Sequence, residues 1–483
     1  MKSKLKFFKA TFITILETNR IFQKELKGVL IMKRMKTVST MVFLTVLCHG
    51  NYAPQKETSD LSAIKLNDSV EVQKRIRLEK FDKILPRVMR DNNIDMWVHI
   101  IRPWTFDPLR FELGANEGVF IFTDLGLNRI ERAAFSADVQ DPMAYDIVIE
   151  EGMERESKPG TPIEMDFRFV ELKKFVSERN PKHIGVNYMD DLNVASSSEG
   201  EPLTDGISYK DYILLIDALG ENYGARVRSA EYVIMDYLAG RVQEEIKLYE
   251  QYGVIAANNL EREFGKVVPG KTNLSDLEGN VFLRVPDGRE IHSDDADPYV
   301  LKGGDLFTIL HGAGTNIFHA DLGGNAYLLK EEETELPPEI QEIWEHAMVV
   351  RKILQTNIKA GRTAGKTLEL LVRKIEEAGY YYNPVDYYDK NADPLKTQIH
   401  LDCHAIGRSG LIGPRISPFG PNWVRNMKIP LLHTFTFEYM VHMPVPKWGK
   451  GKHLYIAFHD GAVVTKKGVV FPYTPDQGIR IIR

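Results

Sequence analysis

The chain has 483 residues and a formal net charge of -5, with 43% hydrophobic and 27% charged residues. These values are those of an ordinary soluble globular protein and exclude a disordered, collagen-like or coiled-coil chain. The length favours two or more domains, and the acidic balance provides no basic field that would attract nucleic acid. With Cys48 and Cys403 as the two cysteines, one disulfide at most can form, and a Cys-based zinc or iron–sulfur site is excluded.

The first fifty residues differ from the rest in charge. They hold ten basic and two acidic side chains, so the remaining body has 52 basic and 65 acidic residues and a net charge of -13. Within them, Met32-Lys-Arg-Met35-Lys36 precedes a mostly apolar, uncharged run from Thr37 to Cys48, and Gly50 follows. A positive segment, a short apolar segment and a small residue are typical of a secretory signal, and this run is too short to span a bilayer. We therefore expect residues 1–50 to be an extension with a signal peptide, and the protein to be exported, either periplasmic or secreted.

Two alternatives to a cleaved signal stay open. Cys48 could carry a lipid anchor, although the bulky Leu47 before it disfavours this. The other alternative is a cytosolic protein with a basic tail. If cleavage follows Gly50, Cys403 is the one cysteine left, which is compatible with an oxidising compartment.

Residues 65–235 alternate between apolar residues at helical spacing and short apolar runs typical of buried strands. This alternation predicts one α/β domain with a mixed sheet. The expected elements are a helix over 70–92, strands over 96–101, 119–122, 130–135 and 183–187, helices over 167–178 and 209–219, and an extended segment over 225–230.

A second domain is expected over residues 240–483. One charged helix from Met235 to Phe264 opens it, residues 281–330 are strand-like, and 337–379 form two helices broken at Lys359–Thr363. Residues 396–483 are mostly strand-like. The fold class is therefore α+β, an α/β domain followed by an antiparallel β domain with flanking helices.

The most informative stretch runs from His292 to Leu329. Residues 303–310 read as a strand, 311–316 as a glycine-rich hairpin loop, and 317–327 as the return strand. Two adjacent strands could place residues 310 and 321 side by side in one pocket.

This stretch resembles the metallopeptidases with the pita-bread fold, which include aminopeptidase P, prolidase, methionine aminopeptidase and creatinase. In that family a Gly-Asp-Leu strand carries one aspartate ligand, and a second aspartate follows eleven residues later on the return strand. Asp321 falls on the second position, whereas Leu310 falls on the first. His292, eighteen residues before Leu310, resembles the family's active-site histidine.

Further motifs follow in the family's order. Lys359–Gly365 resembles a helical corner, and Phe435–Tyr439 resembles the strand with a glutamate ligand, on which Glu438 falls. The segment Leu454–Thr465 resembles the last strand, where His459-Asp460 stands in place of a glutamate and an acidic residue.

The segment His404–Pro414 resembles a histidine-containing segment of the same family. In this alignment Leu411 stands at the metal-binding histidine, and His404 matches a histidine near the substrate. The N-terminal half resembles the creatinase-type N-terminal domain, so the resemblance covers about residues 65–480. It implies a creatinase-type α/β domain over 65–235 and a pita-bread domain over 240–483.

The expected metal site is degenerate. Of five expected ligands, the sequence keeps Asp321 and Glu438, while Leu310, Leu411 and His459 stand at the other positions. A pair of divalent ions brings a charge of about +4 that four carboxylates normally balance, and two cannot. Without metal, Asp321 and Glu438 would lie close together as like charges, so one of them should hold a proton near neutral pH.

Three functions stay open. The substitutions favour an Xaa-Pro aminopeptidase-like pseudoenzyme without cofactor, which binds a peptide or small-molecule amide with little or no peptidase activity. The second is a single-metal hydrolase, in which Asp321, Glu438 and His459 hold one zinc, manganese or cobalt ion and His292 is the acid/base. The third is a metal-free hydrolase resembling creatinase, which relies on His292 and binds a cationic substrate group with Glu438.

Three other histidines are candidate site residues. Strand alternation turns His311 away from the face of residue 310 and puts His319 on the face of Asp321, as a spare ligand. His404 is expected to face the substrate, as a catalytic residue beside His292. We expect no nucleic acid as partner and no membrane span once the signal is removed, and a homodimer stays open.

Overall fold

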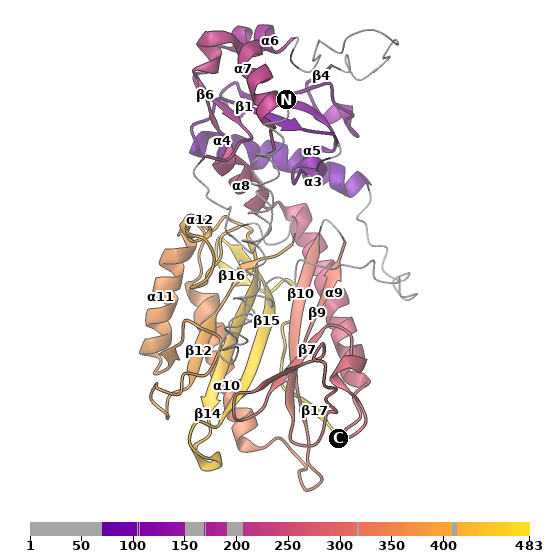
Figure 1. The fold of residues 1–483 in the computed structure, drawn as a ribbon, viewed down its shortest axis with the longest axis vertical. Helices are drawn as coiled ribbons and strands as arrows, with labels where there is room; N and C mark the ends of the chain where they lie inside the picture. Colours follow the sequence, from indigo (N-terminus) through magenta and orange to yellow (C-terminus); the bar gives the residue numbers. More distant parts are fainter. Residues whose placement is uncertain are drawn as a thin grey trace, which may run out of the picture. The chain divides into compact units, whose positions relative to one another are not determined.

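The computed structural model describes residues 70–149 except Trp104 and Phe106, and residues 169, 171–190, 206–315, 318–407 and 413–483. Within these ranges the strands form three sheets (Figure 1). The predicted extension 1–50 and its signal peptide lie outside the described residues. Among the helices of the described ranges, each is too short or too polar to cross a bilayer.

The first sheet is mixed and has the strand order β4-β3-β2-β1-β5-β6. Its strand β1 pairs antiparallel with β2 and parallel with β5, and every residue of β1 is buried. Burial on both faces explains why this strand is apolar at every position except His99. The strands are β1 (Met96–Ile101), β2 (Gly118–Asp124), β3 (Ile130–Phe135), β4 (Ile147–Ile149), β5 (Ile184–Val186) and β6 (Val227–Ser229). The helices of this part are α3 (Val70–Lys83), α4 (Leu85–Asp91), α5 (Arg110–Leu113), α6 (Leu172–Arg179) and α7 (Tyr209–Gly224).

Two helices follow the first sheet, where the sequence predicted one. They are α8 (Glu231–Ala239) and α9 (Gln243–Gly265), and Gly240 between them has extended backbone angles, φ -68° and ψ 134°. A Cβ atom at Gly240 would lie 2.6 Å from Cγ2 of Ile84. The chain therefore bends where it passes close to Ile84, a tertiary contact that the helical pattern does not show.

The other two sheets lie in the C-terminal half. One has the order β17-β10-β9-β7-β8, and the other has the order β11-β12-β14-β15-β16 with β13 paired to β14. The first contains β7 (Asn280–Arg284), β8 (Glu290–His292), β9 (Leu306–Gly314), β10 (His319–Leu328) and β17 (Arg480–Ile482). The second contains β11 (Tyr381–Tyr382), β12 (Gln398–Leu401), β13 (His404–Ala405), β14 (Thr434–Pro444), β15 (His453–Thr465) and β16 (Gly468–Val470). The remaining helices are α10 (Pro338–Asn357), α11 (Ala364–Glu377) and α12 (Asn422–Asn426).

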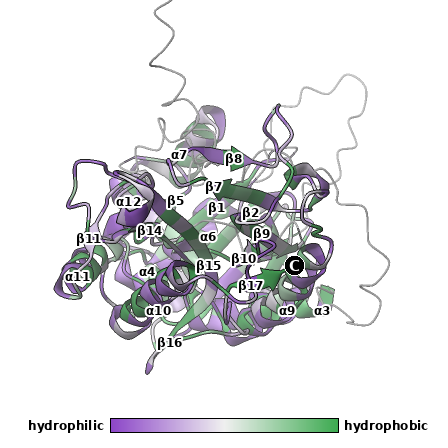
Figure 2. Ribbon diagram, turned by 90° about the horizontal axis from the view of Figure 1, so that it is seen from below, coloured by the Kyte–Doolittle hydropathy of each residue, from purple (hydrophilic) through white to green (hydrophobic). Residues whose placement is uncertain are grey.

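Helices cover these two sheets from outside. Helix α9 packs on β9 and β10, and α10 packs on β14, β15 and β16. Figure 2 shows green and purple alternating along such helices, as expected for elements with one face on a core. Strand β15 also packs across β10, β9 and β7, so the two sheets meet along β15.

The β9–β10 hairpin is longer than the sequence predicted. Residues 311–314 belong to strand β9 and are not a loop, and Asp321 pairs with Gly312 while Leu310 pairs with Gly323. A Cβ atom at Gly314 would lie 2.1 Å from the carbonyl oxygen of Phe318. The glycine here permits a close backbone approach within the sheet, which a sequence pattern does not separate from a turn.

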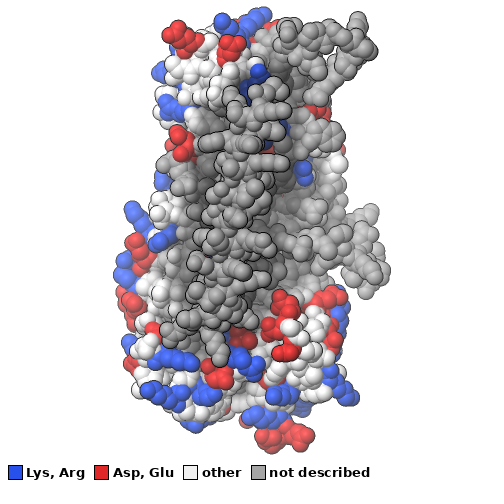
Figure 3. Space-filling model, in the orientation of Figure 1, with Lys and Arg blue, Asp and Glu red and all other residues white. Residues whose placement is uncertain are grey.

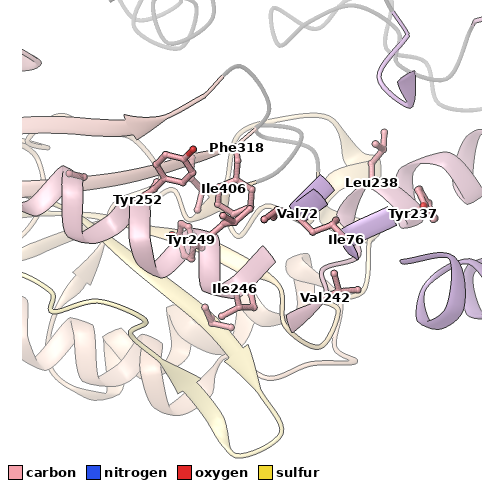
Figure 4. Close-up of a cluster of buried hydrophobic side chains, with 14 of the residues drawn as sticks. Val72, Ile76, Tyr237, Leu238, Val242, Ile246, Tyr249, Tyr252, Phe318 and Ile406 are labelled. Carbon is pink, nitrogen blue, oxygen red and sulfur yellow. The ribbon is translucent and has the colours of Figure 1, made fainter. Parts of the chain in front are cut away.

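One apolar core joins parts of both predicted domains. Val72 and Ile76 of α3 belong to the same buried cluster as Tyr249 and Tyr252 of α9 (Figure 4). The rings of Tyr252 and Phe318 stack with their centroids 5.9 Å apart. The boundary predicted between residues 235 and 240 falls beside this core and stays a prediction.

Candidate functional site

Four titratable side chains from four strands meet between the two C-terminal sheets. They are Asp321 of β10, His404 of β13, Glu438 of β14 and His459 of β15, and we call them the acid–histidine cluster. Glu438 and His459 are direct cross-strand partners. The exposed fraction of the four side chains lies between 9% and 26%, so the cluster is largely sheltered from solvent.

His459 lies between the two carboxylates. Its Nδ1 atom is 3.0 Å from Oδ2 of Asp321, and its Nε2 atom is 3.4 Å from Oε1 of Glu438. His404 approaches the other oxygen of Glu438, with its Nε2 atom 3.3 Å from Oε2. The Nδ1 atom of His404 lies 3.0 Å from the carbonyl oxygen of Ala405, to which it can donate a hydrogen bond. Both imidazoles are thus fixed by partners on their two ring nitrogens.

The charges of the cluster favour a protonated His459. Burial by itself would lower the pKa of His459, but Glu438 and Asp321 outweigh burial and raise it well above its usual value. Burial would likewise raise the pKa values of Asp321 and Glu438, yet His459 outweighs it and both are lowered. The expectation that one carboxyl holds a proton is therefore wrong. It treated the two carboxylates as a pair and left out the imidazolium between them.

Leu310 closes one side of the cluster with hydrocarbon. It lies opposite Gly323, and a Cβ atom at Gly323 would be 2.9 Å from Cδ2 of Leu310 and 3.3 Å from Cβ of His459. Leu310 packs against a small apolar cluster that extends away from His459. The members of this cluster are Phe282, Met440, Tyr455 and Ala457. Leu411, the other substituted position, lies outside the described residues.

The two histidines of the β9–β10 hairpin lie on the faces that strand alternation predicted. His311 pairs with Leu322, on the other face of the β9–β10 hairpin from Asp321, whereas His319 pairs with Gly314 on the face of Asp321. Burial lowers the pKa of His319, although Asp321 opposes this. Asp460 points away from the cluster, because the guanidinium of Arg351 on α10 binds its carboxylate at 2.8 and 3.0 Å.

A hydrogen bond from Tyr473 holds the backbone of Asp321. The hydroxyl of Tyr473 donates a hydrogen bond to the carbonyl oxygen of Asp321 at 3.0 Å. The Tyr473 side chain lies between Gly253 of α9 and Gly461 of β15. A Cβ atom at Gly253 would lie 1.9 Å from Cδ1 of the ring, and one at Gly461 would lie 1.8 Å from the hydroxyl oxygen. Two glycines thus make room for the tyrosine that supports this aspartate.

His292 lies on β8, two residues after Glu290. Its Nε2 atom is 3.0 Å from Oε1 of Glu290, and its ring lies beside the ring of Phe282, with a centroid distance of 5.6 Å. Burial would lower the pKa of His292, but Glu290 outweighs burial and raises it. Since Phe282 belongs to the apolar cluster around Leu310, His292 contacts that cluster through the Phe282 ring.

The fold of the chain has a counterpart among solved structures. The structure is similar to that of X-Pro aminopeptidase from Thermotoga maritima, with a TM-score of 0.50 and 15% identity over 82% of this chain and 100% of that chain. The chain has the fold of an X-Pro aminopeptidase. This confirms the pita-bread fold and the α+β class that the motifs predicted.

Two further structures resemble the chain. An Xaa-Pro dipeptidase from Bacillus anthracis has a TM-score of 0.48 and 15% identity, over 84% of this chain and 99% of that chain. A dipeptidase from Pyrococcus horikoshii has a TM-score of 0.47 and 15% identity, over 84% of this chain and 100% of that chain. No protein-family model and no curated protein matches the sequence.

On this pita-bread fold, the residues present do not fit a pair of divalent ions. Leu310 has no donor atom, and both nitrogens of His459 are occupied by carboxylates. Among the residues described, no group of three or more His, Cys, Asp or Glu side chains is arranged to hold a metal ion. The group between Asp321 and Glu438 is the imidazole of His459, whose raised pKa favours the positively charged form.

His404 and His292 have neighbours that the sequence did not reveal. His404 was expected to face a substrate, but β13 pairs with β14 so that His404 contacts Glu438 inside the cluster. The partner of His292, Glu290, was not predicted as a site residue. It had a visible signal, because residues two apart on a strand share a face.

Proposed function

We propose that this chain is an Xaa-Pro aminopeptidase-like protein that has lost the dinuclear metal site and binds a peptide or small amide with little or no peptidase activity. The observation that carries the proposal is the imidazole of His459 between Asp321 and Glu438, with Leu310 beside it. One imidazolium brings a charge of +1, whereas two divalent ions bring about +4 and activate a water molecule. The acid–histidine cluster retains polar and charged groups that can form hydrogen bonds with an amide. It lacks the ligands that would hold the two ions.

Elemental analysis tests this proposal directly. The purified full chain is dialysed against zinc, manganese or cobalt, washed, and analysed for metal, and turnover of Xaa-Pro dipeptides is measured on the same samples. We expect less than one ion per chain and no turnover, together with measurable calorimetric binding of the dipeptides. Two tightly bound ions per chain would overturn the proposal. Turnover without any ion that vanishes in His292→Ala would instead favour the creatinase-like route.

A single-metal hydrolase is the second candidate, favoured by the orientation of the two imidazoles. The Nδ1 atoms of His404 and His459 face the carbonyl of Ala405 and the carboxylate of Asp321, while both Nε2 atoms face Glu438. Metal-binding histidines commonly donate their second N–H to such acceptors. One ion would then be held by Glu438 and His459, with His404 or Asp321, and would act as a Lewis acid on bound water. One ion per chain that is lost in His459→Ala would establish this candidate.

The remaining proposals concern location and partners. We propose that the mature chain begins soon after Gly50 and is exported, and N-terminal sequencing from the native host tests this. Finding residues 1–31 still attached would contradict it.

Figure 3 shows Lys and Arg interspersed with Asp and Glu on the described surface of one face, which supports the proposal that nucleic acid is no partner. A homodimer is a further proposal, to be tested by sedimentation.

A further inference from the structure

A chain of alternating charges surrounds His292. It starts at His292, whose Nε2 atom contacts Glu290, and the other carboxylate oxygen of Glu290 is 3.0 Å from Nη2 of Arg284. The same guanidinium group binds Asp386 through Nη2 at 2.8 Å to Oδ2 and through Nη1 at 2.9 Å to the carbonyl oxygen. Asp386 in turn accepts a hydrogen bond from Nε2 of His442 at 3.2 Å. We call these five residues the Arg284 network.

Arg284 is the buried centre of the Arg284 network, whereas Glu290 and Asp386 are partly exposed, at 29% and 21%. The exposed fraction of the Arg284 side chain is 7%, and its guanidinium lies over the ring of Tyr455, 4.0 Å from the centroid. The hydroxyl of Tyr455 donates to Oδ2 of Asp386 at 3.2 Å. Ion pairs in such surroundings lose little to solvent screening and fix the geometry of their partners.

The network belongs to the same part of the fold as the acid–histidine cluster. On β14 and β15, the pair His442–Tyr455 lies four cross-strand pairs beyond Glu438–His459, which is about 13 Å along the strands. Between them lie Met440 and Ala457, which pack with Phe282 and Leu310. The two polar groups thus face one apolar strip from its opposite ends.

We propose that Glu290 is a positioning residue for His292 and that Arg284 and Asp386 hold Glu290 in place. The Glu290 carboxylate accepts a hydrogen bond from Nε2–H of the imidazole. Nδ1 is therefore the ring nitrogen that remains to contact a ligand. When the ring carries both protons, Nδ1–H donates to an oxygen acceptor, such as the carbonyl of an amide or a carboxylate. The last step rests on the proposed function, because it takes the ligand to be a peptide or small amide.

The charged groups around His292 all favour this arrangement. Besides Glu290 on its own strand, the segment after β8 contributes the carboxylates of Asp294 and Asp295, which also favour the protonated ring. From β7, Arg284 faces Glu290 and not the imidazole. From the segment after β11, Asp386 neutralises Arg284, so the cation does not draw the Glu290 carboxylate away from His292.

The experiment is nuclear magnetic resonance of the imidazole nitrogens in the full-length chain. His292 is assigned by the loss of its signals in His292→Gln, and its titration is followed in the wild type, in Glu290→Gln and in Asp386→Asn. The matched control is Glu335→Gln, which removes an exposed glutamate in the segment before α10. Thermal unfolding of each variant verifies that it is folded, and Glu290→Asp, which keeps the charge, is the second variant if Glu290→Gln unfolds.

The expected result is a hydrogen-bonded Nε2 proton in the wild type and a titration midpoint that falls in Glu290→Gln, falls less in Asp386→Asn and is unchanged in Glu335→Gln. An unchanged midpoint in Glu290→Gln, or a neutral ring protonated at Nδ1, would overturn the positioning role. Added glycyl-proline should shift the Nδ1 signal and leave Nε2 nearly unchanged. If the variants behave as expected but glycyl-proline shifts no histidine signal, the proposed function fails and the positioning role stands.

Discussion

The Nδ1 atom of His459 lies 3.0 Å from Oδ2 of Asp321, and the two residues belong to different sheets. His459 is on β15 and Asp321 is on β10, so their ion pair joins the two C-terminal sheets. Glu438 completes the contact on the neighbouring strand β14. One imidazolium thus stabilises a junction of three strands, and substitutions here should affect stability as well as binding.

Replacing His459 with Gln should destabilise the chain by about 3–5 kcal/mol, the usual cost of removing one partner of a buried ion pair. Asp321 and Glu438 would then be like charges without a cation, and their pKa values would rise. The variant should therefore regain stability as the pH falls from 7 to 5. Urea unfolding at both pH values measures this, with His346→Gln, a half-buried histidine on α10, as control. A loss below 1 kcal/mol would show that the pair contributes little.

The wild type should lose stability at both ends of the pH range. The pKa of His459 is raised in the folded chain, so its contribution is complete below the unfolded value and is lost as the pH rises through the folded value. The pKa values of Asp321 and Glu438 are lowered, so their contribution is complete above the unfolded values and is lost as the pH falls through the folded ones. Urea midpoints measured across pH should show a plateau between these limits, and the alkaline loss should be absent in His459→Gln.

The double variant Leu310→Asp/His459→Glu should gain metal affinity. It would supply two carboxylates beside Asp321 and Glu438, and four carboxylates can balance two divalent ions. Without metal, the new charge beside Phe282 and Met440 should cost several kcal/mol, and added manganese or cobalt should restore the unfolding midpoint. Calorimetric titration with Leu310→Asn/His459→Gln as control separates charge from size. Equal metal binding by both double variants would contradict this explanation of the loss.

The hydrogen bond of the Tyr473 hydroxyl should contribute less to the stability of the fold than the packing of the Tyr473 side chain. Tyr473→Phe removes the hydrogen bond to the carbonyl oxygen of Asp321 and should cost about 1 kcal/mol. Gly461→Ala should cost more, because its Cβ atom would lie 1.8 Å from the Tyr473 hydroxyl and 2.2 Å from Cζ. Thermal unfolding of both variants gives the order. A smaller loss in Gly461→Ala would mean that the ring can move aside.

Limited proteolysis should cut the segment between β11 and β12 and leave residues 240–483 otherwise intact. Tyr387 and Leu395 have exposed fractions of 52% and 76%, whereas Asp386 is held by Arg284. Cleavage should therefore occur after Asp386, at exposed sites within 387–395. Mass spectrometry of the fragments locates the sites. A second cut is predicted near residues 190–208, most of which lie outside the described residues. Cuts confined to α8 and α9 would contradict the division into domains at residues 235–240.

The sequence by itself determined the order of most elements and the chemical character of individual site residues. Strands β1, β2 and β3 were predicted close to their observed bounds, because short, mostly apolar runs indicate strands without any long-range information. That Leu310 cannot bind a metal ion likewise needs no knowledge of the fold. A leucine side chain has no donor atom wherever the fold places it.

The tertiary structure decided what the remaining polar residues do. His459 contacts Asp321 across 138 residues of sequence, and Arg284 contacts Asp386 across 102, so no local spacing predicts either pair. The break at Gly240 and the strand at Gly314 depend likewise on close approach to another part of the chain. Charge explains why the carboxyl proton prediction failed. The protonation of two carboxylates depends on every charge within a few ångströms, and only the fold brings the imidazole of His459 between them.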